Sequence, residues 1–392
     1  LISANDSSGF TYRGRFTNPE QAAGIGFTVT QKAHNALRWI ISRQGFRRGD
    51  QAIVAWAVSA HDLPHPTAGT LEILGLTGLQ SDEAHSAYTA QDIGIQFRNR
   101  LAGYGRALET TDEIIVMGLD SATQGRTAIS FYRLLTGSEY LERIESWHES
   151  CRWLHRYRFV EVGTESKSKK KPLPYIGAPL PRDIIEAAYG EGVDDKLRVS
   201  TMERLLPCIV DGAPLPRDIV ESTVRRATNR AGIEGWQWEK ALSVACALFN
   251  KSMGKESYSM ALEPERTSRD YLYGRLLALA DNLEQWALIS AGEKRQTTAA
   301  RMMNRFAERP FTTWRTIELA LQPYTARLGR KSWKLQKKID EVKTLFDTDD
   351  FVSDKRLSGE FLLGFSCQRE DLRNRPDETE STQRSEEDGD NE

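Results

Sequence analysis

The sequence lacks several features that would assign it to a simple class. Its 392 residues contain no run of eighteen apolar residues, which argues against a membrane-spanning helix and against a membrane as a partner. Its four cysteines, Cys151, Cys208, Cys246 and Cys367, form no CxxC pair, and this spacing favours buried thiols in a reducing compartment over a disulfide framework. We therefore expect a cytoplasmic protein.

Motifs for common enzymatic chemistry are also missing. The chain has no GxxxxGK[ST] phosphate loop, no GxSxG nucleophile elbow and no Rossmann glycine fingerprint. We therefore expect no catalytic residue, no metal and no cofactor. The first residues do not resemble a signal peptide, and because the chain does not begin with Met we expect an N-terminal region to be missing.

Two histidine clusters offer an enzymatic alternative, a metal-dependent nuclease. The first is the dipeptide His61-Asp62, although two nearby prolines favour a turn after a strand. The second is His148, Cys151 and His155, which at offsets of three and four would lie on one helix and could converge on a metal. No fourth ligand is evident, so a structural helix is the simpler interpretation.

The first part of the chain alternates between strand and helix patterns. Nine Trp, fourteen Phe and a hydrophobic content of 39% are sufficient for globular cores. We expect strands at Phe27–Val29, Ala52–Val58, Glu113–Leu119 and Thr127–Phe131, and helices near 33–41, 86–108 and 138–157. A loop with Asp, Ser and Gly separates the last two strands and suits a hairpin. Residues 1–160 are thus predicted to form an α+β platform with a mixed or antiparallel sheet.

The rest of the chain favours helices. Residues 161–252 are expected to form a helical connecting region, and residues 253–346 an all-α bundle of about four helices. One apolar stripe of this bundle contains Leu272, Leu276, Leu279, Leu283 and Trp286. Residues 347–392 are rich in acidic and polar side chains, so we expect an acidic, largely disordered tail beyond about Ser366.

An octet, Gly-Ala-Pro-Leu-Pro-Arg-Asp-Ile, occurs twice, at 177–184 and at 212–219. A period of thirty-five residues is typical of helical solenoids, but about three units are generally needed for stability and only two are present. Pro181 and Pro216 fit the first turn of a helix. The octets therefore predict two similar helix starts.

Positive charge is concentrated in the predicted bundle, although the net charge of the chain is −2. Residues 253–346 hold seventeen Lys and Arg against eleven Asp and Glu, whereas residues 347–392 hold six against fifteen. A solvent-facing basic surface can bind phosphates through counterion release and needs no base-reading side chains. The predicted nucleic-acid-binding residues of the bundle are Arg266, Arg269, Arg275, Lys294, Arg295, Arg301, Arg305, Arg327, Arg330, Lys331, Lys334 and Lys338.

Four of these basic residues would lie on one face if residues 327–338 formed a continuous helix. Arg327, Lys331, Lys334 and Lys338 would fall within a narrow arc at 100° per residue, and such a row could follow a phosphate backbone. An ordinary solvated helix face explains the same pattern.

Two further segments suggest nucleic-acid contacts. Lys167, Lys169, Lys170 and Lys171 lie before two prolines in a predicted loop and could clamp a displaced strand, or could simply keep a linker soluble. The segment Phe10–Phe16 interleaves aromatics with arginine, as stacking surfaces do, but an edge strand explains it equally well.

Four ordered segments together resemble the large subunit of the type I-C CRISPR Cascade complex over roughly residues 10–345. They are His34–Trp39, Leu119–Arg126 with Phe131–Leu135, Trp147-His148, and Ser268–Leu277. The resemblance implies a non-catalytic subunit that helps to bind target DNA, to stabilise the R-loop and to recruit a helicase-nuclease in antiviral defence. The implied partners are CRISPR RNA, the backbone subunits, target DNA including its displaced strand, and the helicase-nuclease.

The resemblance also implies that the C-terminal bundle resembles the Cascade small subunit and can be made separately by internal translation. Met253 and Met260 precede the Ser268 segment, so either could be the start. Residues that read a flanking motif are not assigned, because the N-terminal region is expected to be missing. A purely protein-binding scaffold is the remaining alternative.

Overall fold

The computed structural model describes residues 26–43, 46–48, 51–75, 90–108, 112–123, 126–162, 169–233, 235–254 and 258–374. Contacts divide the chain into two compact units. Unit 1 holds Leu1–His65 and Ala107–Gly137, and unit 2 holds Pro66–Arg106 and Ser138–Glu392. The expected platform, 1–160, contributes to both units, so its boundaries differ from theirs.

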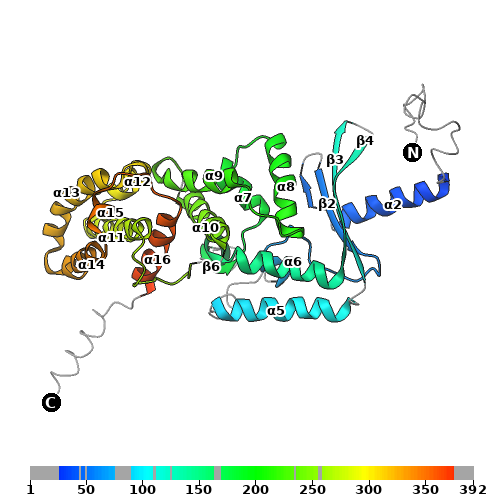
Figure 1. The fold of residues 1–392 in the computed structure, drawn as a ribbon, viewed down its shortest axis with the longest axis horizontal. Coiled ribbons are helices and arrows are strands. Elements are labelled where there is room, and N and C mark those ends of the chain that lie inside the picture. Colours follow the sequence, from blue (N-terminus) through cyan, green and yellow to red (C-terminus); the bar gives the residue numbers. More distant parts are fainter. Residues whose placement is uncertain are drawn as a thin grey trace, which may run out of the picture. The chain divides into compact units, whose positions relative to one another are not determined.

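The described part of unit 1 contains one antiparallel sheet in the strand order β1-β2-β3-β4 (Figure 1). Val54 of the second strand and Ile114 and Val116 of the third are fully buried. The hairpin of the last two strands confirms the expected pair of strands. The expected strand Phe27–Val29 is wrong, because these residues begin a helix. The elements are α2 (Phe27–Arg43), β1 (Phe46–Arg48), β2 (Gln51–Ala57), β3 (Glu113–Thr123) and β4 (Arg126–Thr136).

The described part of unit 2 begins with the short helix α3, two longer helices and a second antiparallel hairpin. The helix expected near 138–157 ends at Ser150, and the chain continues as a strand whose first residue, Trp153, is buried in the main hydrophobic core. The sequence pattern predicted the wrong structure for residues 153–157, because aromatic residues such as Trp153 and Tyr157 occur in strands as well as in helices. The elements are α3 (Thr70–Ile73), α5 (Ala90–Ala107), α6 (Gly137–Ser150), β5 (Trp153–Val162) and β6 (Lys169–Gly177).

Helices make up the rest of unit 2, so the predicted change from α+β to all-helical structure is confirmed (Figure 1). The first group is α7 (Pro181–Tyr189), α8 (Asp195–Val210), α9 (Arg217–Thr228), the 3-10 turn η1 (Arg230–Gly232) and α10 (Gly235–Ser252). The second group is α11 (Arg269–Ser290), α12 (Thr298–Glu308), α13 (Pro310–Leu328), the 3-10 turn η3 (Gly329–Ser332), α14 (Trp333–Thr344), α15 (Thr348–Val352) and α16 (Glu360–Asn374).

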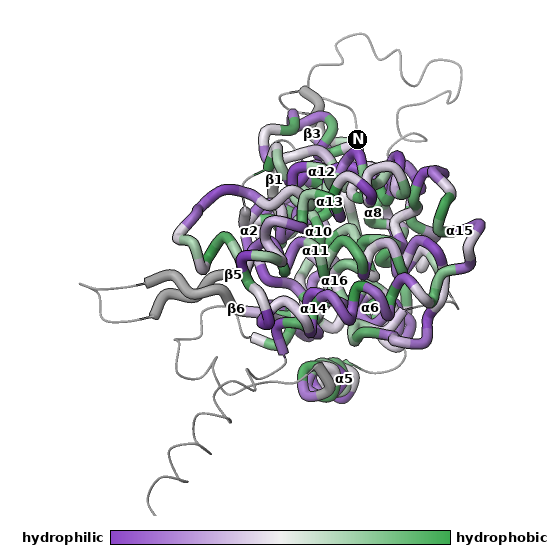
Figure 2. The backbone as a smooth tube through the Cα atoms, turned by 90° about the vertical axis from the view of Figure 1, so that its left-hand side faces the viewer, coloured by the Kyte–Doolittle hydropathy of each residue, from purple (hydrophilic) through white to green (hydrophobic). Residues whose placement is uncertain are grey.

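The central helix of the bundle is α11, which packs on α12, α13, α14 and α16 (Figure 2). Its contact with α16 is unusually close, because Gly274 lies against the backbone of Phe361 and Gly364 lies against the backbone of Tyr271. Most of α16 is buried. The expectation of a disordered tail is therefore wrong for residues 360–374, where an apolar stretch at Phe361–Phe365 outweighs the acidic composition.

The two octets begin two helices, as predicted, but their surroundings differ. In the first copy, Ala178 and Asp183 are almost completely buried, and Gly177 lies against the side chain of Thr70. In the second copy, Gly212, Arg217 and Asp218 are exposed. The same eight-residue sequence therefore lies largely in the core at 177–184 and partly at the surface at 212–219.

Candidate nucleic-acid interface

Five of the predicted basic residues are engaged in ion pairs within the bundle. The carboxylates come from positions between one and thirty-four residues away along the chain. The pairs are Arg266 with Glu263, Arg269 with Asp270, Arg295 with Glu284 and Glu293, Arg327 with Glu293, and Lys338 with Asp371. The prediction that these side chains have no carboxylate partner is therefore wrong for all five.

Arg275 is a sixth predicted residue that is engaged within the protein. Its side chain is only 7% exposed, and its guanidinium donates to Oε1 of Gln368 and to the carbonyl oxygen of Pro264. Burial lowers the pKa of this guanidinium from its ordinary value. Arg275 therefore fastens α11 to α16 and to the segment before it, and it does not face a ligand.

The predicted row from Arg327 to Lys338 does not lie on one helix. Arg327 is in the last turn of α13, Lys331 is in η3, and Lys334 and Lys338 are in α14. Gly329 ends α13 with a backbone φ of +55°, a conformation that favours glycine. The narrow arc calculated for a continuous helix is therefore wrong, although Arg330, Lys331 and Lys334 are exposed.

One row of arginines, which contains the predicted residues Arg301 and Arg305 together with Arg309, is exposed. Arg301, Arg305 and Arg309 are exposed at intervals of four along α12 and its C-terminal cap, and none forms an ion pair with a described carboxylate. The opposite face of this helix buries Met303 and Phe306. Successive members of such a row lie on neighbouring turns of one face.

The orientation of α12 is fixed by its N-terminus. Thr297 caps the helix by accepting a hydrogen bond from the backbone N–H of Ala300, and it also donates to the carboxylate of Asp281. Glu284, which is fully buried, accepts from the backbone N–H of Thr298. These contacts hold the arginine row toward solvent on a rigid support. Lys294, just before the helix, is also exposed.

The predicted lysine cluster falls partly outside the described residues. Lys167 lies outside them, as does the aromatic and arginine segment 10–16. The backbones of Lys169, Lys170 and Lys171 begin β6 and pair with Val162, Glu161 and Val160 of β5. These three residues are thus in a strand and not in the expected loop.

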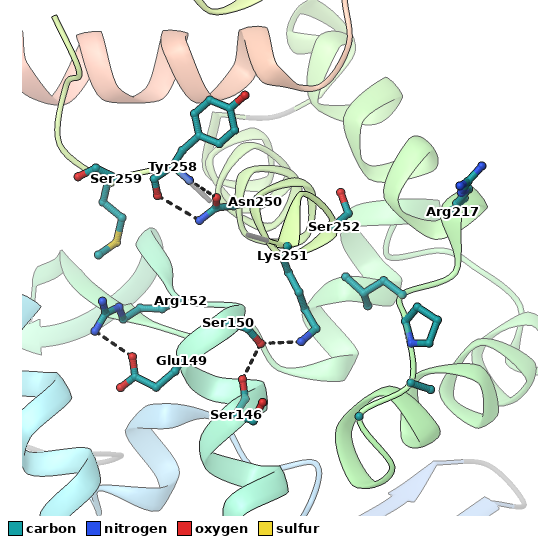
Figure 3. Close-up of a pocket in the computed structure, with 16 residues that line it drawn as sticks. Ser146, Glu149, Ser150, Arg152, Arg217, Asn250, Lys251, Ser252, Tyr258 and Ser259 are labelled. Carbon is teal, nitrogen blue, oxygen red and sulfur yellow. Dashed lines mark hydrogen bonds and ion pairs between the residues drawn. The ribbon is translucent and has the colours of Figure 1, made fainter. Parts of the chain in front are cut away.

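A groove that the sequence did not indicate lies in unit 2. One hollow of about 820 Å³ (Figure 3) and another of about 480 Å³ share the lining residues Leu215, Arg217 and Ser252. The end of α6, the second octet and the end of α10 line the first hollow, and α9 and the segment 356–359 line the second. The only sequence signals were the repeated octet and the lysine that precedes Ser252.

Lys251 occupies the floor of the first hollow. In Figure 3 its side chain reaches from α10 to α6, where its ammonium donates to the hydroxyl of Ser150 at 2.5 Å. The same ammonium lies 5.1 Å from the ring centroid of Trp147. Beside it, Arg152 is paired with Glu149 at 3.1 Å. Lys251 itself has no carboxylate partner among the described residues.

The histidine and cysteine cluster is not assembled as a metal site. His148 is on α6 and His155 is on β5, so the expectation that they share a helix with Cys151 is wrong. Nδ1 of His148 forms a hydrogen bond with the hydroxyl of Thr70. Nε2 of His155 donates a hydrogen bond to the carbonyl oxygen of Gly177. Burial raises the pKa of Cys151 to about 12. Within the described residues, no group of three His, Cys, Asp or Glu side chains could hold a metal ion.

The His61-Asp62 dipeptide lies in the loop after β2. Nδ1 of His61 is 3.1 Å from the hydroxyl of Ser59, which donates to Asp112. Both His61 and Asp62 are exposed. The prediction that this dipeptide lies in a loop after a strand is therefore confirmed. No helix of the described residues is long and apolar enough to cross a bilayer.

Comparison with known proteins adds one finding to this geometry. A family model described as CRISPR-associated protein (Cas_Csd1) matches residues 1–373 of the chain. No curated protein is significantly similar to it.

Proposed function

Because the chain belongs to the Cas_Csd1 family of CRISPR-associated proteins, we propose that it is the non-catalytic large subunit of a type I-C surveillance complex, Cascade. In this role it binds target DNA, stabilises the R-loop and provides a docking surface for a helicase-nuclease in the cytoplasm. The guide RNA reads the target by base pairing, and the protein holds backbones. CRISPR RNA and the backbone subunits are its direct partners.

The observation that carries the DNA-binding part of this proposal is the arginine row of α12. Arg301, Arg305 and Arg309 are exposed, form no ion pair with a described carboxylate and stand on a capped helix. Such a row can bind the phosphates of a nucleic acid without contacting its bases, and this property suits a subunit that must accept any target sequence.

A separately translated small subunit is part of the proposal. Met253 and Met260 both pack against the main core. A product that begins at either residue would lack α10, whose Trp238 makes an edge contact with Phe365 of α16 at a centroid distance of 6.1 Å. Such a product therefore needs another surface against α16. Mass spectrometry of purified complex tests this idea, and the absence of any C-terminal fragment beginning at one of these methionines would reject it.

Reconstitution tests the proposed function. A guide-loaded complex should retain matching target DNA when this chain is present and should lose most of that retention when the chain is omitted. The same samples are incubated with Mg²⁺, Mn²⁺ and Zn²⁺ to test the nuclease alternative. Retention that does not depend on the chain, or cleavage by the chain alone, would contradict the proposal. Assembly that needs the chain, with unchanged DNA retention, would indicate a protein-binding scaffold.

A further inference from the structure

The groove of unit 2 carries more positive charge than its own carboxylates can neutralise. Its two hollows are lined by five cations and by two carboxylates, Glu149 and Glu221. Glu149 is paired with Arg152, and Arg356 is paired with Glu308 of α12 at 3.2 Å. The cations left without a carboxylate among the described residues are Arg217, Arg225 and Lys251.

The surroundings of these three cations supply neutral hydrogen-bonding groups. The serines 146, 150, 252 and 259 line the first hollow (Figure 3), as does the segment 212–214. The hydroxyls of Ser150 and Ser252 already donate to backbone carbonyl oxygens, so the serine hydroxyls that can donate to a phosphate are those of Ser146 and Ser259. Hydroxyl and backbone N–H groups are common phosphate contacts in protein–nucleic-acid complexes. The first hollow therefore combines Arg217 and Lys251 with hydroxyls, and Arg225 lines the adjoining second hollow. Together the three cations are suited to a chain of phosphates.

The wall made by the second octet is rigid. The carbonyl oxygen of Pro207 accepts a hydrogen bond from the backbone N–H of Ala213, and the carbonyl oxygen of Pro214 accepts one from the thiol of Cys208. Gly212 has a φ of +68°, which lets the chain turn sharply after α8. Arg217 is therefore presented on a fixed support, while the equivalent arginine of the first octet belongs to a segment packed in the core.

We propose that this groove binds the backbone of a single-stranded nucleic acid, with Arg217, Arg225 and Lys251 as its phosphate contacts. The inference rests on the proposed function and adds a site to it. Lys251 is half-buried among the residues that line the first hollow, and we expect a flexible single strand to place a phosphate there more readily than a rigid duplex. Tyr258, the aromatic of the first hollow, is buried and stacked on Tyr271, so no base is stacked there. Binding is consequently independent of base identity.

The groove is also joined to the arginine row of α12. The ion pair between Arg356 and Glu308, and the hydrogen bond from the N–H of Leu357 to the carbonyl oxygen of Ala307, attach its rim to the C-terminal end of that helix. A strand that leaves the groove at this rim meets the end of α12 that carries Arg305 and Arg309.

Fluorescence anisotropy with the full-length chain and labelled oligothymidylate tests the site. The triple variant R217Q/R225Q/K251Q should bind at least about tenfold more weakly near physiological salt. Three lost phosphate contacts should also reduce the slope of log affinity against log salt by about 2, because single strands release about 0.7 counterion per contact. A blunt duplex of the same length should bind with nearly equal affinity to the variant and to the original chain.

The matched control is R106Q/K196Q/R315Q, which removes the same charge from exposed positions outside the groove. It should retain the original affinity and slope within twofold. Equal losses in both triple variants would show a diffuse charge effect and would overturn the site. Unchanged binding of oligothymidylate by the groove variant would also overturn the site. The proposed function is tested separately, by the reconstituted complex. A large change in oligoadenylate binding relative to oligothymidylate would contradict the base-independent contact.

Discussion

Asp183 and Asp218 occupy the same position of a repeated octet, yet only Asp183 is in the core. Asp183 is 1% exposed and accepts hydrogen bonds from the hydroxyl of Tyr157 at 2.8 Å and from the guanidinium of Arg158 at 2.9 Å. Asp218 is exposed and accepts from Arg204. That hydrogen bond holds the pKa of Asp218 below its usual value. The same octet can therefore be required for folding at one site and be available for binding at the other.

This difference predicts opposite sensitivities to one substitution. D183N should lower the free energy of unfolding by about 3 kcal/mol, because it removes the charge that faces Arg158 and Lys240 in a buried network. D218N should change it by less than about 0.5 kcal/mol, because exposed ion pairs contribute little. Urea unfolding followed by tryptophan fluorescence measures both. Equal effects of the two substitutions would contradict the distinction between the octets.

Close packing of α11 on α16 predicts a second contrast. A methyl group at Gly364 would overlap the backbone carbonyl of Tyr271, so G364A should destabilise the protein by about 3 kcal/mol. Gly103 in α5 has open space around it, and G103A should stabilise the helix by about 0.8 kcal/mol. Thermal unfolding of the two variants separates these outcomes. A harmless G364A would mean that residues 360–374 are not packed as described.

Buried histidines predict a dependence of stability on pH. Burial lowers the pKa of His148 to about 3 and those of His65 and His155 to about 4, from the ordinary 6.5. Between these values the unfolded chain binds more protons than the folded chain, so stability should fall as pH decreases from 6.5 toward 4. Each histidine contributes up to about 1.4 kcal/mol per pH unit. Between pH 6.5 and 5, the free energy of unfolding of H148Q should depend on pH less steeply than that of the original protein, by the contribution of one histidine. Parallel curves of unfolding free energy against pH for the two proteins would be inconsistent with a buried neutral His148.

The sequence was informative where one local pattern decides the structure. The hairpin of β3 and β4 followed from alternating residues around a polar loop, and the apolar stripe of α11 followed from helical spacing. It failed at Phe27–Val29, where three β-prone residues form the first turn of a helix, and at α16, where a short apolar stretch was hidden in an acidic region.

Site residues were harder to predict, because exposure of a cation depends on partners distant in sequence. Arg327 is paired with Glu293, thirty-four residues earlier, and Lys338 with Asp371, thirty-three residues later. Composition showed a surplus of positive charge but could not assign it to particular side chains. The groove was missed for a related reason, since α6, the second octet and α10 meet only in the folded chain.

The most direct test of the central claim is the salt dependence of target DNA dissociation from the guide-loaded complex that contains R301E/R305E. We expect at least about tenfold weaker retention near physiological salt and a slope of log affinity against log salt that is lower by about 2, with no change in sequence preference. The matched variant R327E/K337E reverses two cations that are already paired with Glu293 and Glu341, and it should have a much smaller effect. Identical salt curves for the original complex and for R301E/R305E would contradict the claim that α12 holds the nucleic-acid backbone.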